Sequence, residues 1–421
     1  MRPKLGRMTI ADSDILTLTA SLTEAGLNGT SEDTLVSGFC ERANAIGIPV
    51  DRALVIIDTL HPVYEGRLFR WGQDPSQPGL VEYGRTVVPD GVTLGEEEER
   101  AAASWRASPF FHMLTTGESV LRLTAEHASV FPVMQDYLMG GIKGGAAIVN
   151  RFGPGGVIGE MDAVYSSWMT KQAGGFTGDQ LDALVRLVPT LALAVKTTAL
   201  TRMTATLMET YLGRDAAHRV LSGRIMRGVA DRIEAAIWFS DLRGFTRVTD
   251  SAPEQVIPLL NDYADVAVSA IHAHGGDVLK LIGDGILAIF AAEDRAHACG
   301  AALSAAAVAR REVAALNARR AHDLLPVTDM YLGLHVGEVY YGNIGSLDRL
   351  DFTVVGPAVN EASRIATMCR SVEQPVLVSQ AFAAVDGMRG RLVSVGRYAL
   401  RGVEQPQELF TLEPVSVSQL L

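Results

Sequence analysis

The order of strand and helix patterns between residues 233 and 345 constrains the fold more than any other feature of the sequence. The stretch opens with EAAIWFSD, a strand pattern, and apolar residues at helical spacing follow at 251–276. Residues 277–290, DVLKLIGDGILAIF, have the pattern of two strands joined at a G-D-G turn. An alanine-rich helical pattern at 294–318 and a strand pair at 329–345 come next. This order, β-α-β-β-α-β, predicts a ferredoxin-like sheet with helices on one face.

The whole chain divides into three parts by pattern. Residues 1–176 mix short strand and helical patterns, which predicts one α+β domain. Residues 177–232 are mainly helical and are predicted to form a linker, with a possible coiled coil that transmits signals. Residues 233–414 form the second α+β domain, which contains the ferredoxin-like order.

Several helix boundaries depend on single residues. Pro189 is expected to interrupt the helical run of the linker, and Gly213 is expected to end it. Ser251 and Glu254 have the spacing of a capping box for the helix at 251–276. Apolar residues in the linker recur at intervals of three and four, which fits either a coiled-coil seam or one helix packed on its own domain. These residues are Leu200, Met203, Leu207 and Tyr211.

Composition limits the class of protein. The 421 residues are 48% hydrophobic and 20% charged, as in a folded globular protein, and the net charge of −11 argues against binding to nucleic acid or to an anionic membrane. The three cysteines are far apart, so neither a disulfide framework nor a zinc site is indicated. The apolar runs fall short of the ~20 residues that span a bilayer, and the first residues do not resemble a signal peptide. A cytoplasmic protein without membrane partners is expected.

Asp241 ends the apolar strand AAIWFSD, where an aspartate commonly caps the following turn. A second aspartate, Asp284, lies between the glycines of the G-D-G turn. In the ferredoxin-like order the two strands are neighbours, so both carboxylates can meet at one edge of the sheet. Two converging carboxylates repel each other unless a cation lies between them, and such oxygen ligands suit Mg²⁺ held against phosphates.

The residues after Asp241 have the character of a phosphate-binding turn. LRGFT would place backbone N–H groups at a helix start, where a phosphate chain is favoured. Gly244 permits close approach of a ligand, Phe245 contributes its backbone, and Thr246 adds a hydroxyl group. Together with the acidic pair, this turn predicts a site for metal ions and a triphosphate.

Three motifs, FSDLRGFT, KLIGDG and VVGPAVNEASR, together resemble the class III nucleotidyl cyclases, the adenylyl and guanylyl cyclase catalytic domain. The resemblance covers about 180 residues. It implies that Asp241 and Asp284 bind two Mg²⁺ ions, for which Mn²⁺ can substitute, with the Leu242 carbonyl as a further ligand. It also implies that Asn360 orients the ribose and that Arg364 stabilises charge on the α-phosphate. The alternative for Arg364 is an ordinary surface salt bridge with Glu361 or another acid.

Base selection, by the same resemblance, depends on Lys280 and Thr353. Lysine stands at the first position in members that use ATP and glutamate in those that use GTP, so ATP is expected as substrate and cyclic AMP and pyrophosphate as products. Thr353 occupies a position where many members have aspartate, and the chain resembles the threonine-type subgroup. Guanylate cyclase activity is the alternative. Arg401 is a possible phosphate contact in the last hairpin, in place of a lysine found in some members.

The family's composite active sites imply a homodimer, because the metal aspartates of one domain face the other residues of its partner. The first 176 residues resemble a GAF-like regulatory domain in architecture and are expected to respond to an unknown small-molecule or protein effector. A catalytically inactive cyclase-like module that binds nucleotide or only dimerises is the alternative from another functional class.

Overall fold

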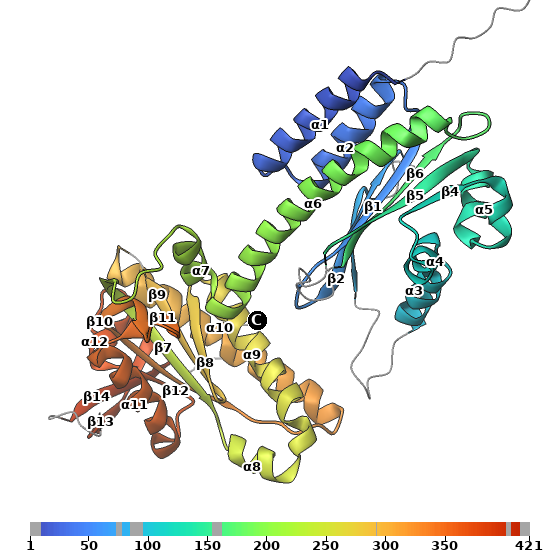
Figure 1. Cartoon of the computed structure of the whole chain (residues 1–421). Helices are drawn as coiled ribbons and strands as arrows, with labels where there is room; N and C mark the ends of the chain where they lie inside the picture. Colours follow the sequence, from blue (N-terminus) through green and yellow to red (C-terminus); the bar gives the residue numbers. More distant parts are fainter. Residues whose placement is uncertain are drawn as a thin grey trace, which may run out of the picture. The chain divides into compact units, whose positions relative to one another are not determined.

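The computed structural model describes residues 10–72, 78–84, 96–153, 162–291, 293–400 and 406–412. The chain separates between Leu207 and Met208 into two compact units, called here the N-terminal and the C-terminal unit. This boundary falls inside the segment predicted to be a helical linker. Figure 1 labels the helices and strands of both units.

The N-terminal unit is an α+β domain, as predicted, with an antiparallel sheet in the order β3-β2-β1-β6-β5-β4. Its elements are α1 (Asp12–Leu27), α2 (Glu32–Ala45), β1 (Arg52–Asp58), β2 (Tyr64–Trp71), β3 (Leu80–Gly84), α3 (Glu96–Arg106), α4 (Pro109–Thr116), β4 (Val120–Leu123), α5 (Pro132–Met139), β5 (Gly144–Arg151), β6 (Ala163–Thr170) and α6 (Gly178–Leu212).

Alternating residues of β1 place the sheet between two helical layers. Val55 and Ile57 are buried with α1, α2 and α6 on one face, whereas Ile56 is buried with α4 and α5 on the other. In Figure 1 these two groups of helices lie on opposite sides of the sheet. The structure establishes an antiparallel α+β domain here, and the finer assignment as GAF-like stays a prediction.

Helix α6 corrects one sequence expectation, because it runs unbroken through Pro189. Proline removes one helical hydrogen bond, but Leu187, Val188 and Leu191 around it are buried in the core with α1 and α2. The helix ends before Gly213 as predicted, and Gly213 has a φ of 85°. Of the predicted seam, Met203 is buried in the N-terminal core, which favours a helix packed on its own domain over a coiled coil at that point.

The same helix is apolar enough to be tested as a membrane span. Its most apolar 18-residue window has a mean hydropathy of 1.5, and 56% of that window is buried inside the protein. Core helices of globular domains commonly have this composition. Somewhat more than half of this window therefore packs inside the protein.

The C-terminal unit contains a mixed sheet in the order β13-β14-β12-β10-β7-β9-β8, with β11 paired to β10. Its elements are α7 (Arg214–Leu221), β7 (Ala230–Leu242), α8 (Phe245–Ser251), α9 (Val256–Ala273), β8 (Asp277–Ile282), β9 (Gly285–Ala291), α10 (Arg295–His322), β10 (Met330–Gly345), β11 (Leu350–Val355), α11 (Pro357–Val372), β12 (Val376–Ser379), α12 (Gln380–Ala383), β13 (Leu392–Tyr398) and β14 (Gln407–Leu412).

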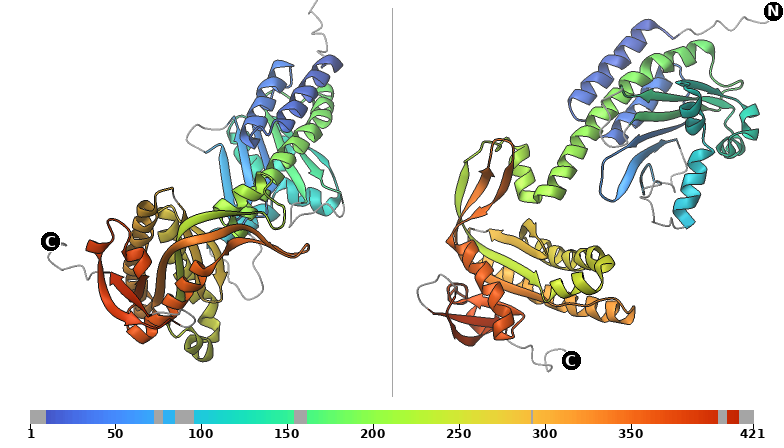
Figure 2. Two further views of the ribbon diagram at one scale, coloured as in Figure 1. Left: turned by 90° about the vertical axis from the view of Figure 1, so that its left-hand side faces the viewer. Right: turned by 60° about the horizontal axis from the view of Figure 1, so that its bottom comes forward.

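The order β10-β7-β9-β8 is that of a ferredoxin-like sheet, and α9 and α10 cover one face of it (Figures 1 and 2). Helices also cover part of the opposite face, where α7 and α11 pack against β7, β9 and β11. Two details differ from expectation. Residues 329–345 form one long strand, β10, rather than a strand pair, because β11 supplies the partner of its second half. The predicted capping box is absent, because Ser251 ends α8 and α9 begins only at Val256.

Candidate active site

Asp241 and Asp284, predicted to meet at one edge of the sheet, lie together in the structure. Strand β7 pairs with β9 so that Ser240 stands opposite Ile286, which places the end of β7 beside the β8–β9 turn. The backbone N–H of Leu242 donates to Oδ1 of Asp241 at 3.0 Å and to Oδ2 of Asp284 at 3.3 Å. One amide group therefore bridges the two carboxylates.

The glycines of the G-D-G turn make this approach possible. Gly283 has a φ of 62°, a backbone conformation that side chains disfavour. A Cβ atom at Gly285 would lie 2.8 Å from the carbonyl oxygen of Ser240, so any larger residue would push the turn away from β7. The two glycines thus hold Asp284 against the end of the neighbouring strand.

Strand alternation explains why the apolar run of β7 ends on an acid. Trp238 and Leu242 point into the core beneath α9 and α10. Ile237 points to the opposite face, as does Asp241, which is exposed where the covering elements of that face end. The aspartate therefore belongs to the outer row of the strand and is directed toward solvent rather than into the core.

Loss of hydration on its protein side and, next, the neighbouring Asp284 carboxylate raise the pKa of Asp241 to about 6. The backbone N–H of Leu242 opposes this shift because it donates to the ionised form. The exposed side of Asp241 leaves the carboxylate open to a cation from solvent. Two acids that resist joint ionisation are suited to share a positive charge.

The donor set fits Mg²⁺ but does not surround it. Within the described ranges, no group of three or more His, Cys, Asp or Glu side chains could hold a metal ion. Asp241 and Asp284, with the carbonyl oxygen of Leu242, would supply hard oxygen ligands but too few to complete a shell. Mg²⁺ normally keeps several waters or phosphate oxygens in its remaining positions, so a nucleoside triphosphate can complete its coordination shell.

Lowering the pH through 6 should weaken Mg²⁺ binding by about tenfold per pH unit, because the proton on Asp241 then competes with the cation. The sign follows from a pKa raised to about 6, since the carboxylate is fully available only above that pH. Calorimetric Mg²⁺ titrations on either side of pH 6 would measure the change. The Asp241→Asn variant should bind weakly at every pH, and a wild-type affinity that did not change across this range would contradict the shared-charge interpretation.

The turn after Asp241 is fixed by backbone hydrogen bonding. The N–H of Arg243 donates to the carbonyl of Asp329 at 2.7 Å, and Gly244 has a φ of 67° immediately before α8. Gly244 and Thr246 are exposed, whereas Phe245 is partly buried against the core of the C-terminal unit. The ring of Phe245 therefore anchors the turn, and its backbone is the part available to a ligand.

Asn360 and Arg364 lie one turn apart on α11, and two glycines of β10 position this helix. A Cβ atom at Gly333 would lie 2.5 Å from the carbonyl oxygen of Ala362, and one at Gly337 would lie 2.9 Å from the Cβ of Ala358. Helix α11 therefore packs directly on the strand backbone. Asn360 is exposed, and Arg364 is half-buried.

The salt bridge that offered an ordinary explanation for Arg364 is not found among the described residues. Glu361 instead faces the buried His335, with Nδ1 and Oε1 3.6 Å apart. Burial lowers the pKa of His335, so near pH 7 the ring is neutral and this contact is polar rather than ionic. The hydrogen-bond partner of His335 is the hydroxyl of Ser379, whose oxygen lies 2.9 Å from Nδ1. Arg364 keeps its donors available for a ligand.

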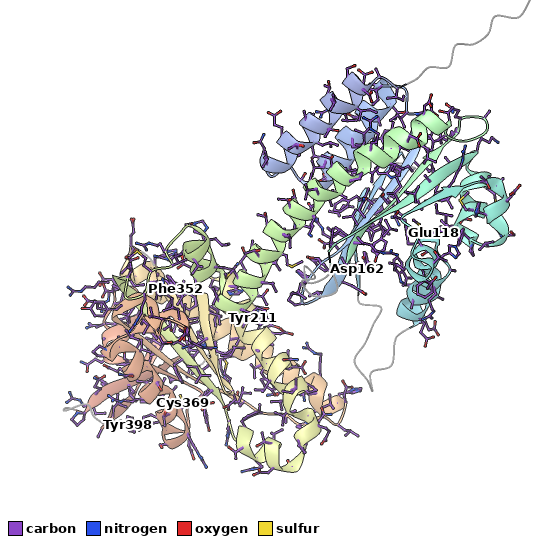
Figure 3. The ribbon with its side chains drawn as sticks, viewed as in Figure 1. Glu118, Asp162, Tyr211, Phe352, Cys369 and Tyr398 are labelled. Carbon is purple, nitrogen blue, oxygen red and sulfur yellow. The ribbon has the colours of Figure 1, made fainter. Side chains whose placement is uncertain are left out.

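Lys280 and Thr353 come from strands that pack together. The shared core of β8 and β11 includes Leu279 and Phe352. Phe352, labelled in Figure 3, packs edge-on against Tyr341, with the two ring centroids 4.9 Å apart. The Lys280 ammonium forms an ion pair with Asp351, two residues before Thr353 on the same face of β11. The sequence analysis missed Asp351, although the alternation in L-D-F-T places it beside Thr353.

The predicted residues thus form two groups. Asp241 and Asp284 make one group. Lys280, Thr353, Asn360 and Arg364 make the other, because β8, β11 and α11 share one core. No described hydrogen bond or ion pair joins the two groups. Arg401, the possible phosphate contact, lies outside the described residues.

Comparisons with known proteins find similarity in part of the chain. Residues 230–414 match the family model described as adenylate and guanylate cyclase catalytic domain. An uncharacterised protein of Mycobacterium tuberculosis is 32% identical over 207 residues, which cover 47% of this chain and 36% of that protein. Adenylate cyclase 1 of Rhizobium meliloti is 34% identical over 166 residues, which cover 39% of this chain and 25% of that protein. The chain therefore spans between a quarter and little more than a third of these relatives' own length.

Two solved structures are similar to part of the chain. The adenylyl cyclase CyaB from P. aeruginosa is 24% identical with a TM-score of 0.41, and the similarity covers 45% of this chain and 98% of that one. The guanylyl cyclase Cya2 is 28% identical with a TM-score of 0.40, and the similarity covers 45% of this chain and 95% of that one.

Proposed function

Because residues 230–414 are a class III adenylyl/guanylyl cyclase catalytic domain, we propose that this protein converts ATP into 3′,5′-cyclic AMP and pyrophosphate. The observation that carries the proposal is the acidic pair, in which one backbone amide joins Asp241 and Asp284 at an open sheet edge. The adenylate cyclase of Rhizobium meliloti, 34% identical over 166 residues, supports this class of reaction.

The proposed roles follow from the chemistry of each group. In the reaction the ribose 3′-oxygen forms a bond to the α-phosphorus as the bond to pyrophosphate breaks. Bound at the acidic pair, Mg²⁺ would supply charge neutralisation and a lower pKa for the 3′-hydroxyl. Arg364 donates to α-phosphate oxygens as they gain charge, Asn360 orients the ribose, and the backbone of 244–246 contacts the phosphate chain.

ATP is proposed over GTP because of Lys280. Its ammonium group only donates hydrogen bonds, so it matches the N1 acceptor of adenine and opposes the N1–H of guanine. Thr353 is buried two residues after Asp351, the ion-pair partner of Lys280, and its hydroxyl can accept from the 6-amino group. Guanylate cyclase activity remains the second candidate, because the threonine hydroxyl can donate to a guanine oxygen as well as accept.

We also propose a homodimer, since no described hydrogen bond or ion pair joins the two groups of site residues within one chain. Large apolar side chains are exposed on β8, β10 and β11 and in the β10–β11 turn, around the strand that carries Lys280. Such exposed apolar surface is typical of a protein–protein interface. These residues are Leu281, Ile282, Tyr340, Leu347, Leu350 and Val355.

The N-terminal unit is proposed to be a GAF-like regulatory domain that binds a small-molecule or protein effector. Helix α6 ends at Leu212, and at the next residue, Gly213, a Cβ atom would lie 2.4 Å from the carbonyl oxygen of Val278 on β8. A displacement of this helix end would therefore act on the strand that carries Lys280. We propose a cytoplasmic location.

Replacing Arg364 with alanine should lower kcat by about 10²–10³-fold with a much smaller change in KM, because its contact is made mainly in the transition state. Steady-state kinetics with ATP would measure both constants. Arg370, an exposed arginine later on the same helix, provides the matched control, and Arg370→Ala should leave both constants unchanged. An effect of Arg364→Ala confined to KM would contradict the proposed role.

The proposed function is tested by incubating the purified chain with ATP or GTP and with Mg²⁺ or Mn²⁺, followed by direct assay of the cyclic product. Cyclic AMP as the main product supports the proposal, and cyclic GMP as the main product supports the guanylate cyclase candidate. If nucleotide binds and no cyclic product forms with either metal, the inactive module is supported instead.

A further inference from the structure

The ion pair between Lys280 and Asp351 connects the residue proposed to read the base with an acid that has no assigned role. The Lys280 ammonium contacts Oδ2 of Asp351, and their side chains are 40% and 37% exposed. Lys280 lies on β8 and Asp351 on β11, so the pair forms only when β11 folds back along β10 and reaches β8.

The strands hold this pair in a defined place. Leu279 precedes Lys280 and is buried, and Phe352 follows Asp351 and is buried in the same core. A bulge between Val278 and Lys280 interrupts the alternation of β8, and the ion pair itself shows that the Lys280 and Asp351 side chains face each other. Thr353 projects on the same side of β11 as Asp351, so the acid, the lysine and the threonine lie next to one another.

We propose that Asp351 is a specificity-determining positioning residue, which holds Lys280 toward the base and biases the pocket toward adenine. This inference rests on the proposed nucleotide cyclase function. A threonine hydroxyl accepts and donates, so Thr353 alone distinguishes adenine from guanine poorly, whereas a carboxylate only accepts. The lysine ammonium has three N–H donors, so it can keep Asp351 while it donates to adenine N1.

The same pair disfavours a guanine-selective pocket. A glutamate at position 280 would stand against the Asp351 carboxylate, and two like charges in contact oppose each other. Exchanging the lysine alone is therefore insufficient to change the substrate. Removing the charge of Asp351 is the second step that such a change requires.

The first test is Asp351→Asn, which keeps the size of the side chain and removes its charge. We expect kcat/KM for ATP to fall about tenfold, mainly through KM, with little loss for GTP, since hydrogen bonds to charged groups have this magnitude. Asp351→Glu should restore part of the preference for ATP. A structural defect would lower the values for both nucleotides by one factor, and that result would overturn the inference.

The second test is a double-mutant comparison. Lys280→Glu should be nearly inactive with both nucleotides, whereas Lys280→Glu combined with Asp351→Asn should use GTP at least about tenfold better than Lys280→Glu alone. Equal GTP activity in the single and double variants would overturn the proposal.

Glu234 provides a matched control, because its ion pair with Arg295 has similar exposure, 49% and 45%, and lies at the other end of β7 from Asp241. Glu234→Gln should leave the ATP-to-GTP ratio unchanged. If the wild-type chain forms no cyclic product, the proposed function is wrong, and selectivity is then measured as competition of ATP and GTP for a fluorescent ATP analogue. Equal competition in wild type and Asp351→Asn, or no nucleotide binding at all, would overturn the inference about Asp351.

Discussion

Replacing Asp241 with alanine should reduce cyclic-product formation by about 10³-fold or more, because several kcal/mol of charge stabilisation depend on a cation at this carboxylate. The fold should survive, since Asp241 is exposed and the next residue, Leu242, stays buried in the core beneath α9 and α10. Initial rates with ATP and saturating Mg²⁺ would measure the loss. Asp323, an exposed acid at the end of α10, provides a control that should retain full activity when changed to alanine.

Thermal unfolding separates the loss of metal binding from misfolding. A carboxyl group with a pKa raised from 3.8 to about 6 in the folded state opposes folding when ionised, above pH 6. In a chelator at pH 7, Asp241→Asn should therefore unfold at the same or a higher temperature than the wild type. Added Mg²⁺ should raise the unfolding temperature of the wild type only. Near-normal turnover, or equal Mg²⁺ stabilisation of both proteins, would refute the metal assignment.

Mixing two inactive chains should restore activity. Asp241→Ala removes the acidic group, whereas Arg364→Ala removes the group on α11, and the proposed dimer combines one of each at every site. Random pairing of equal amounts gives heterodimers with one intact site, so about a quarter of wild-type activity is expected from a two-fold symmetric dimer. Co-expression with two affinity tags would isolate the doubly tagged heterodimers, whose cyclic-AMP assay should give about half of the wild-type activity per dimer.

The matched control combines Asp241→Ala with Asp284→Ala. Both variants are damaged in the same half-site, so their heterodimers contain no complete site and should stay inactive. Recovery in this control, or none in the mixture of Asp241→Ala and Arg364→Ala, would show that the site is not shared between chains.

Features that depend on local pattern could be predicted from the sequence. An apolar run marked β7, the glycines around Asp284 marked the β8–β9 turn, and Gly213 marked the end of α6. Predictions that assumed a local rule without its packing context were wrong. Pro189 does not break α6, because buried contacts on both sides of it hold the helix together.

Long-range pairing accounts for what the sequence analysis missed or misplaced. The glycines within residues 329–345 suggest a turn between two strands. In the structure Gly333 and Gly337 lie in one continuous strand, where they allow α11 to pack against its backbone. Asp351 gave no signal alone, because its meaning depends on Lys280, which is 71 positions earlier and adjacent only after β11 folds back.

The sequence by itself determined which acids end up at a strand edge, because side-chain alternation and glycine turns are properties of a few consecutive residues. Only the tertiary structure decided which residues share a site. Carboxylates affect each other's pKa, and a lysine is held by an acid, only across a few ångströms, and those distances are set by how separate strands align.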